Sequence, residues 1–332
     1  DPTGASAVWV AARVPDDSVA VVANMFVVRE VNLTDSENFL GRQDMWELAQ
    51  AQGLWSPGQP KDWTKTFSDG EYAHKYYSGR RIWGAFRRLA PFASAQLGLG
   101  PDYIDLKESA PYPFTVKLGQ KDKAVSAKLL MDINRDWYEG TEFSTGDSNL
   151  AGGAFGSAVR YSGGKNEYYE VDGNWERTIM LHRTSSSIVL QARRIKGLSD
   201  DRSGVVWFGP HSPLATSYTP LVLALGGAPA GLADAWQGRY SEGSNFHAHR
   251  LVANILQIKF DNMVQDLRLL QDQQERNGAA LVAPERLLAE RGAPEAALDA
   301  LRVHVVRVRS EFHQLVSTLL FTLFSSSSRS PR

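Results

Sequence analysis

Residues 252–270 read VANILQIKFDNMVQDLRLL, and this stretch decides the fold class together with the chain before it. Its apolar side chains recur every three or four residues, which predicts a long helix with one buried face. A second pattern of this kind runs from Leu298 to Leu319. Because the earlier part of the chain favours short strands, the order of strands followed by long helices predicts an α+β domain. We expect the two helices to pair with each other or to pack on a sheet.

The strand candidates upstream are short and rich in valine. Residues 7–12 (AVWVAA) and 18–24 (SVAVVAN) are separated by the turn-forming residues Pro15-Asp16-Asp17. Residues 177–181 and 188–192 predict a hairpin, and residues 205–208 predict a further strand. The remaining expected elements are helices over 36–52, 78–89 and 126–138.

The composition gives no general attraction to nucleic acid or membranes, so binding to either would need a local patch. Lys and Arg total 36 against 37 Asp and Glu, so the net charge is −1 and no overall field attracts nucleic acid or an anionic membrane. The longest strongly apolar run near an end, Leu315 to Phe324, has ten residues, whereas a membrane helix needs about 20. We therefore expect neither a nucleic-acid partner nor a membrane span.

The sequence contains no cysteine, which excludes disulfides, thiolate metal sites and a thiol nucleophile within these 332 residues. His247 and His249 are two positions apart, so on a helix they point to different faces and no metal site is expected from them. The adjacent carboxylates Asp16 and Asp17 are explained by the turn. The arginines at 80, 81, 87 and 88 are typical of a solvated helix face, with a phosphate site as the alternative.

Asn32-Leu33-Thr34 matches the acceptor pattern for N-glycosylation and stands in a polar loop. Glycosylation of Asn32 would place the protein on the secretory route. The sequence therefore favours a lysosomal or extracellular glycoprotein, with a cytoplasmic location as the alternative.

Several strings share their order and spacing with one known family. They are AVWVAARVPDD at 7–17, VVAN at 21–24, NF at 38–39, YSGRRIW at 77–83, WYEGTEF at 137–143 and ERTI at 176–179. With these strings the chain resembles the dipeptidase A and secernin family of cysteine dipeptidases, which belong to the N-terminal-nucleophile (Ntn) hydrolases. The likeness runs from Ala7 to about Gln271 and corresponds to the C-terminal two-thirds of such an enzyme.

The resemblance implies a fold, a four-layer αββα sandwich in which helices cover two stacked antiparallel sheets. In this chain the sandwich would lack its N-terminal strands and its nucleophile. Residues 1–275 would form the dipeptidase part, residues 276–324 a helical extension packed on it, and residues 325–332 a polar tail.

The resemblance also implies hydrolysis of dipeptides by a cysteine at the mature N-terminus, with no metal or organic cofactor. The α-amine of that cysteine has a pKa of about 8 and can take the thiol proton itself. The family pattern places the cysteine upstream of Asp1. We therefore expect proteolytic processing, a partner fragment of the same precursor that carries the cysteine, and no activity from this chain alone. Whether the protein forms a homo-oligomer is left open.

The resemblance assigns roles to four residues. Asn24 would donate its amide to the oxyanion, and Arg81 would lie beside the nucleophile and stabilise negative charge. Tyr138 and Glu139 would bind substrate, with the carboxylate holding the dipeptide's ammonium group. Without the resemblance, Asn24 could simply end a strand and Arg81 could pair with a surface carboxylate.

Two other functions remain open at this point. One is a catalytically inactive relative that serves as a structural or interaction subunit. The other is an amidase that acts on a different small amide with the same chemistry.

Overall fold

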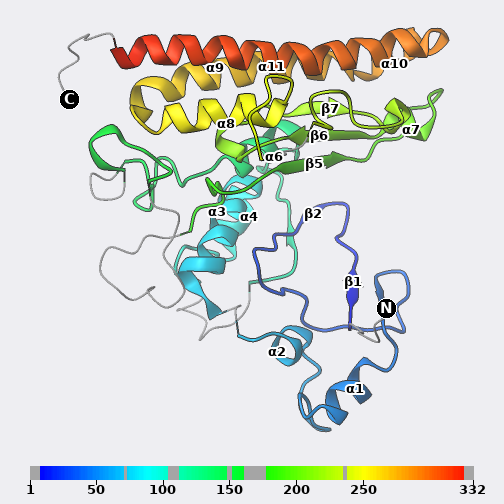
Figure 1. Cartoon of the computed structure of the whole chain (residues 1–332). Coiled ribbons are helices and arrows are strands. Elements are labelled where there is room, and N and C mark those ends of the chain that lie inside the picture. Colours follow the sequence, from blue (N-terminus) through cyan, green and yellow to red (C-terminus); the bar gives the residue numbers. More distant parts are fainter. Residues whose placement is uncertain are drawn as a thin grey trace. The chain divides into compact units, whose positions relative to one another are not determined.

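The computed structural model describes residues 8–70, 73–103, 112–147, 152–160, 177–234 and 238–324. The chain divides into two compact units, residues 1–125 with 165–169, and residues 126–164 with 170–332 (Figure 1). Helices and small antiparallel sheets occur together, which confirms the α+β class. In the described part of the chain, no helix combines the length and apolar character that crossing a bilayer requires.

The first unit contains two short antiparallel pairs of strands. β1 (Val10–Ala12) pairs with β3 (Phe39–Gly41), and β2 (Ser18–Val19) pairs with β4 (Val116–Lys117). The strand expected over 18–24 therefore keeps only its first two residues in a ladder. The helix expected over 36–52 is wrong in its first half, because Phe39 to Gly41 pair with β1 instead.

The helices of the first unit begin after β3. They are α1 (Met45–Ala51), α2 (Trp63–Phe67), the π-helical turn η2 (Lys75–Gly79), α3 (Arg80–Leu89) and α4 (Pro91–Gln96). Aromatic rings pack α1 against α2, with Trp46 and Trp63 buried and the Trp46 and Phe67 ring centres 5.9 Å apart. Asp62 caps α2 by accepting a hydrogen bond from the backbone N–H of Lys65.

The second unit is built on a three-stranded antiparallel sheet with helices on it. β5 (Ser187–Gln191), β6 (Val205–Gly209) and β7 (Thr219–Leu221) form the sheet in that order. Its helices are α6 (Ala127–Asn134), the four-residue α7 (Asp200–Ser203), α8 (Asn245–Leu256), α9 (Phe260–Leu281), α10 (Pro284–Ala289) and α11 (Pro294–Phe324). α11 lies along α8 and α9, which confirms that the predicted helices pair (Figure 1).

The hairpin expected from residues 177–181 and 188–192 is wrong. β5 pairs with β6, which follows it along the chain. Residues 177–181 instead bond to the loop after α6, where Met180 N–H donates to Asp136 O and the Tyr138 hydroxyl donates to Arg177 O. These bonds satisfy backbone groups that a hairpin would have paired.

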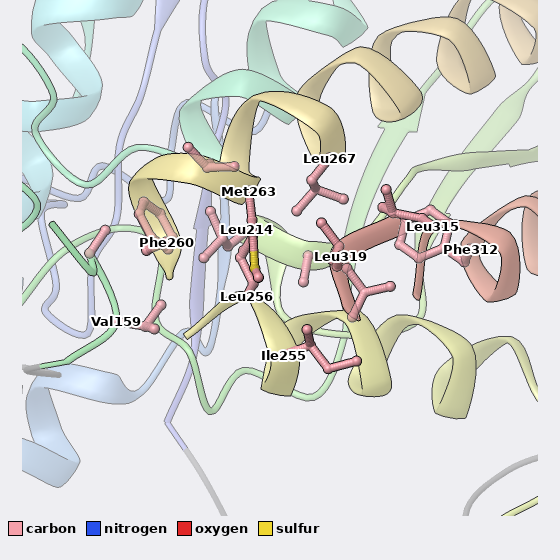
Figure 2. Close-up of a cluster of buried hydrophobic side chains, with 14 of the residues drawn as sticks. Val159, Leu214, Ile255, Leu256, Phe260, Met263, Leu267, Phe312, Leu315 and Leu319 are labelled. Carbon is pink, nitrogen blue, oxygen red and sulfur yellow. The ribbon is translucent and has the colours of Figure 1, made fainter. Parts of the chain in front are cut away.

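The helix expected through residue 256 and beyond is interrupted. α8 ends at Leu256 and α9 begins at Phe260, so the apolar pattern continues while the helix changes direction. Both helices then place apolar side chains on α11, where Leu256, Phe260 and Met263 join Phe312 and Leu319 in one buried cluster (Figure 2). Each such side chain contributes about 1.5–3 kcal/mol when it is fully buried.

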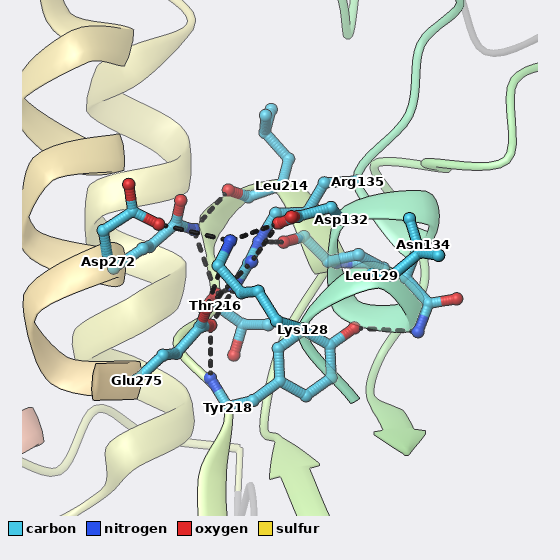
Figure 3. A network of polar contacts seen from close by, with 12 residues as sticks. Lys128, Leu129, Asp132, Asn134, Arg135, Leu214, Thr216, Tyr218, Asp272 and Glu275 are labelled. Atoms are coloured by element: carbon cyan, nitrogen blue, oxygen red, sulfur yellow. Dashed lines mark hydrogen bonds and ion pairs between the residues drawn. The ribbon is translucent and has the colours of Figure 1, made fainter. Parts of the chain in front are cut away.

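A buried polar network joins α6 to α9 and to Tyr218, the residue directly before β7 (Figure 3). The guanidinium of Arg135 forms a bidentate ion pair with Glu275, and their side chains are 11% and 3% exposed. Arg135 also donates to the carbonyl of Thr216 at 2.8 Å, and Glu275 accepts the backbone N–H of Tyr218 at 3.1 Å. The network therefore fixes α6 against the sheet and α9 through charge-assisted hydrogen bonds.

Candidate active site

Arg81 is held by the turn that precedes it. It is the second residue of α3, directly after the π-helical turn η2. Its Nε donates to the backbone carbonyl of Tyr77 at 2.6 Å, and its guanidinium lies 4.6 Å from the centre of the Tyr77 ring. The side chain is thus fixed at its base before it reaches any other part of the unit.

The far end of the Arg81 side chain contacts Asn24. Nη1 donates to the amide oxygen Oδ1 of Asn24 at 2.9 Å, and Nη2 lies 3.5 Å from the carbonyl of Ala23. The structure therefore brings together the two residues that were predicted to be catalytic. An arginine can only donate, so this contact turns the amide oxygen of Asn24 toward Arg81 and directs the Nδ2 donor elsewhere.

Asn24 has an unusual backbone conformation. Its φ is 52°, in the left-handed region that asparagine tolerates better than most residues. The side chain is exposed while its neighbours Ala23 and Met25 are buried, so the chain anchors the backbone on both sides of it. Asn24 lies beyond β2 and does not end that strand.

Tyr138 also has a backbone in the left-handed region. Among the described residues, Asn24 and Tyr138 are the two non-glycine residues with positive φ, and φ of Tyr138 is 64°. The Asp136 carboxylate accepts the Tyr138 backbone N–H at 2.8 Å, and the fully buried Tyr138 hydroxyl donates to Arg177 O at 2.6 Å. Strained residues of this kind persist where the surroundings fix them, and they cluster at functional sites.

Glu139 follows Tyr138 and is exposed. Its two carboxylate oxygens accept hydrogen bonds from Arg268 at 3.1 and 2.6 Å, and the Arg268 guanidinium stacks 4.7 Å from the Trp137 ring. Tyr138 and Glu139 belong to the second unit, whereas Asn24 and Arg81 belong to the first.

Arg80 corrects one expectation, that the arginines of this helix form a solvated face. Arg80 is 1% exposed, with its guanidinium 5.7 Å from the centre of the Trp83 ring and 4.0 Å from the Asp102 carboxylate. Successive helix positions are about 100° apart, so Arg80 turns inward where Arg81 turns toward Asn24. The hydrogen bond from Lys75 holds the pKa of Asp102 below its ordinary value.

Tyr77 is a partner of Arg81 that the sequence did not identify. Its carbonyl and its ring both contact Arg81. The available signal was the spacing of four residues between an aromatic residue and an arginine, which places them on one side of a helical turn.

The glycosylation candidate lies elsewhere in the first unit. Asn32 is exposed, and its side-chain oxygen accepts hydrogen bonds from the backbone N–H and the hydroxyl of Thr34 at 3.1 and 2.7 Å. Asn32 also lines a hollow of about 890 Å³ formed by segments 28–32 and 60–62 with Phe39 and Phe114. Neither Asn24 nor Arg81 lines this hollow.

The histidines of α8 take structural partners. His247 Nδ1 accepts the backbone N–H of Ser241 at 3.0 Å, and His249 Nδ1 lies 2.6 Å from the carbonyl of Asn245. In the part of the chain that the structure describes, no cluster of three or more His, Cys, Asp or Glu side chains could hold a metal ion.

Comparison with known proteins gives one family. The model of peptidase family C69 matches residues 2–273. A probable dipeptidase of Latilactobacillus sakei is 25% identical over 214 residues, which are 63% of this chain and 38% of that protein. A dipeptidase of Bifidobacterium longum (strain NCC 2705) is 24% identical over 286 residues, 83% of this chain and 48% of that protein.

A third relative is shorter in its match. A probable dipeptidase of Salmonella dublin is 26% identical over 140 residues, 42% of this chain and 30% of that protein. The chain spans less than half the length of each of these curated relatives.

Proposed function

Because the chain belongs to peptidase family C69, we propose that the protein containing it hydrolyses the peptide bond of dipeptides. The observation that carries this proposal is the 2.9 Å hydrogen bond between Arg81 and Asn24, which joins the two predicted catalytic residues. The names of the relatives, which are dipeptidases or probable dipeptidases, support the substrate class.

The proposed nucleophile is an N-terminal cysteine on a polypeptide outside these 332 residues, because they contain no cysteine. Its α-amine takes the thiol proton, and the thiolate attacks the carbonyl carbon of the dipeptide. The carbonyl electron pair moves to oxygen, which becomes the oxyanion. When the oxyanion collapses, the C–N bond breaks, the amino group leaves with the proton from the α-amine, and water then hydrolyses the acyl-enzyme.

Asn24 donates its Nδ2–H to the oxyanion in this proposal. The donor is available because Arg81 occupies Oδ1 and thereby fixes which end of the amide faces the reaction. Arg81 acts as a positioning residue through this bond, and its positive charge also favours the thiolate and stabilises the developing oxyanion.

Tyr138 and Glu139 stay predictions as substrate-binding residues. The strained backbone at Tyr138 and the fixed orientation of Glu139 by Arg268 support the proposal that Glu139 holds a dipeptide's ammonium group. Glu139→Gln should then raise KM more than it lowers kcat. An unchanged KM would remove Glu139 from the site.

The four-layer Ntn sandwich is proposed on the same basis. The small antiparallel sheets and the covering helices of the second unit are compatible with it. Glycosylation at Asn32 and a secretory, lysosomal or extracellular location also stay predictions, supported by the exposed side chain of Asn32.

The test uses the protein expressed from its complete gene. N-terminal sequencing and intact mass identify any fragment that begins with cysteine and any glycan on the chain. A dipeptide panel is assayed for free amino acids before and after treatment with iodoacetamide. We expect hydrolysis that alkylation abolishes, from a sample that contains an N-terminal cysteine.

Two results would contradict the proposal in different ways. Hydrolysis that survives alkylation would exclude the cysteine nucleophile but keep the dipeptidase activity. Absence of hydrolysis from a folded sample would favour the second candidate, an inactive dipeptidase-like subunit with a structural or interaction role, for which the absence of cysteine from these residues is the motivating observation.

A further inference from the structure

A second cavity lies within the second unit. It has a volume of about 420 Å³ and opens between the start of α6, the strands β5 and β6, and the C-terminal part of α9. Small-molecule sites typically have volumes of about 300–1,000 Å³. Its apolar lining combines the exposed Ala279 and the half-buried Ala127 and Ala283 with the buried side chains of Met131, Trp207 and Val282.

Arg193 lines this cavity with an incompletely satisfied guanidinium. Nε donates to the carbonyl of Ser203 and Nη1 to the carbonyl of Val282, each at 2.9 Å. Nη2 is buried and has no hydrogen-bond partner in the described structure. Burial lowers the pKa of this guanidinium, which reflects the cost of keeping its charge away from water. A buried cationic N–H normally has an acceptor.

The uncompensated charge at the cavity is positive. Arg276 lines it as well, is exposed, and forms no ion pair with any described carboxylate. The other charged lining residues are already paired: Lys128 with Asp132 and Asp272, and Glu275 with Arg135. Ser126, the N-cap of α6, also lines the cavity, so the positive end of that helix adds to the field.

We propose that this cavity binds a small carboxylate with an apolar body. The exposed guanidinium of Arg276 donates to the carboxylate, and the incompletely satisfied guanidinium of Arg193 adds positive charge beside it. The apolar body packs on Ala279 and Ala283 and on the accessible edge of Trp207. A free organic acid and a hydrophobic amino acid share this chemistry.

The site goes beyond the proposed function and does not depend on it. The match to the peptidase family ends at residue 273, whereas Arg276, Ala279 and Val282 all follow that point. A bound carboxylate would connect α6, the sheet and α9, and would therefore stabilise the second unit by mass action.

The test is a calorimetric titration of the protein with phenylacetate, benzyl alcohol and phenethylamine. These ligands carry the same ring with an anionic, a neutral and a cationic group. We expect saturable binding of phenylacetate at up to millimolar concentrations and much weaker binding of the other two. Comparison with L-phenylalanine separates the two sources. Tighter binding of L-phenylalanine than of phenylacetate assigns an amino acid, and weaker binding assigns a free organic acid.

Two variants locate the site. Ala279→Trp fills the cavity from an exposed helix position, and its matched control is Ala280→Trp, an exposed neighbour that does not line the cavity. We expect Ala279→Trp to abolish phenylacetate binding, Ala280→Trp to preserve it, and Arg276→Gln to weaken it about tenfold. The proposal is overturned if phenylacetate does not saturate, if benzyl alcohol binds equally well, or if Ala279→Trp leaves binding unchanged.

Discussion

Nη1 of Arg81 donates a hydrogen bond of 2.9 Å to Oδ1 of Asn24, across 57 positions of the sequence. The same guanidinium is tied to the Tyr77 carbonyl through Nε. These two bonds connect the exposed amide of Asn24 to the start of α3. The orientation of that amide is therefore set by a helix rather than by a loop alone.

Replacing Arg81 with lysine should remove this control. A single ammonium group cannot reach the Tyr77 carbonyl and the Asn24 amide oxygen with the geometry of the guanidinium. We expect Arg81→Lys to lower kcat for dipeptide hydrolysis about 10- to 100-fold with a smaller change in KM, because the oxyanion donor is misaligned. Arg88→Lys, on the same helix, is the matched control. Equal kcat values for the two variants would show that Arg81 does not position Asn24.

We expect the ion pair between Arg135 and Glu275 to be the largest contribution of this polar network to the stability of the second unit. Glu275→Gln leaves the buried guanidinium of Arg135 with only the more exposed Asp132 carboxylate, 3.6 Å away, which costs about 3 kcal/mol of the free energy of unfolding. Glu285→Gln changes an exposed glutamate and should cost less than about 0.5 kcal/mol. Urea unfolding measures both.

The double variant Arg135→Met with Glu275→Leu provides the stricter comparison. Because it removes both charges, it should be more stable than Glu275→Gln alone. If the double variant loses as much free energy of unfolding as Arg135→Met and Glu275→Leu lose together, the two charges do not interact.

Acid should destabilise the fold through three buried histidines. Burial lowers the pKa of His211 to about 4, of His249 to about 3 and of His304 to about 4. In the unfolded chain each titrates near 6.5. Between pH 6.5 and 4 the unfolded state therefore binds more protons, so the free energy of unfolding falls as the pH falls. Above pH 6.5 the stabilisation by these neutral histidines is complete.

Urea midpoints at pH 7.5 and pH 5 measure this effect. Each pKa unit corresponds to about 1.4 kcal/mol, so three such groups can remove several kcal/mol by pH 5. His249→Leu should make the midpoint less dependent on pH, because leucine can take the buried place beside Phe312 without titrating. A midpoint that is equal at both pH values would refute the assignment of neutral buried histidines.

Local sequence patterns predicted the helices better than the strand pairings. The helix expected over 126–138 begins where it was predicted, as α6, and the apolar spacing located the long helices. The hairpin failed because Arg177 and Met180 find partners around Asp136 and Tyr138, and no pattern within the segment reports those partners. β7 was missed because Pro220 lies within it, and proline is tolerated there only because β7 is an edge strand of its sheet.

The candidate site could be predicted from the family resemblance but not from the local chemistry of its residues. On its own residues, Asn24 reads as the end of a strand and Arg81 as one of four helix arginines. Their contact depends on the path of the chain between them, which no spacing rule gives. The positive φ of Asn24 and Tyr138 was likewise invisible, because valine-rich and aromatic strings predict extended backbone.

The rate of dipeptide hydrolysis by Asn24→Asp tests the central claim most directly. Aspartate keeps an acceptor for Arg81 and preserves the local fold, but it lacks the Nδ2 donor and places negative charge near the oxyanion. We predict that kcat falls about 100- to 1,000-fold, while Asn277→Asp, an exposed change on α9, leaves it unaffected. A kcat for Asn24→Asp that equals that of the wild type, in a folded protein, would contradict the assignment of Asn24 as the oxyanion donor.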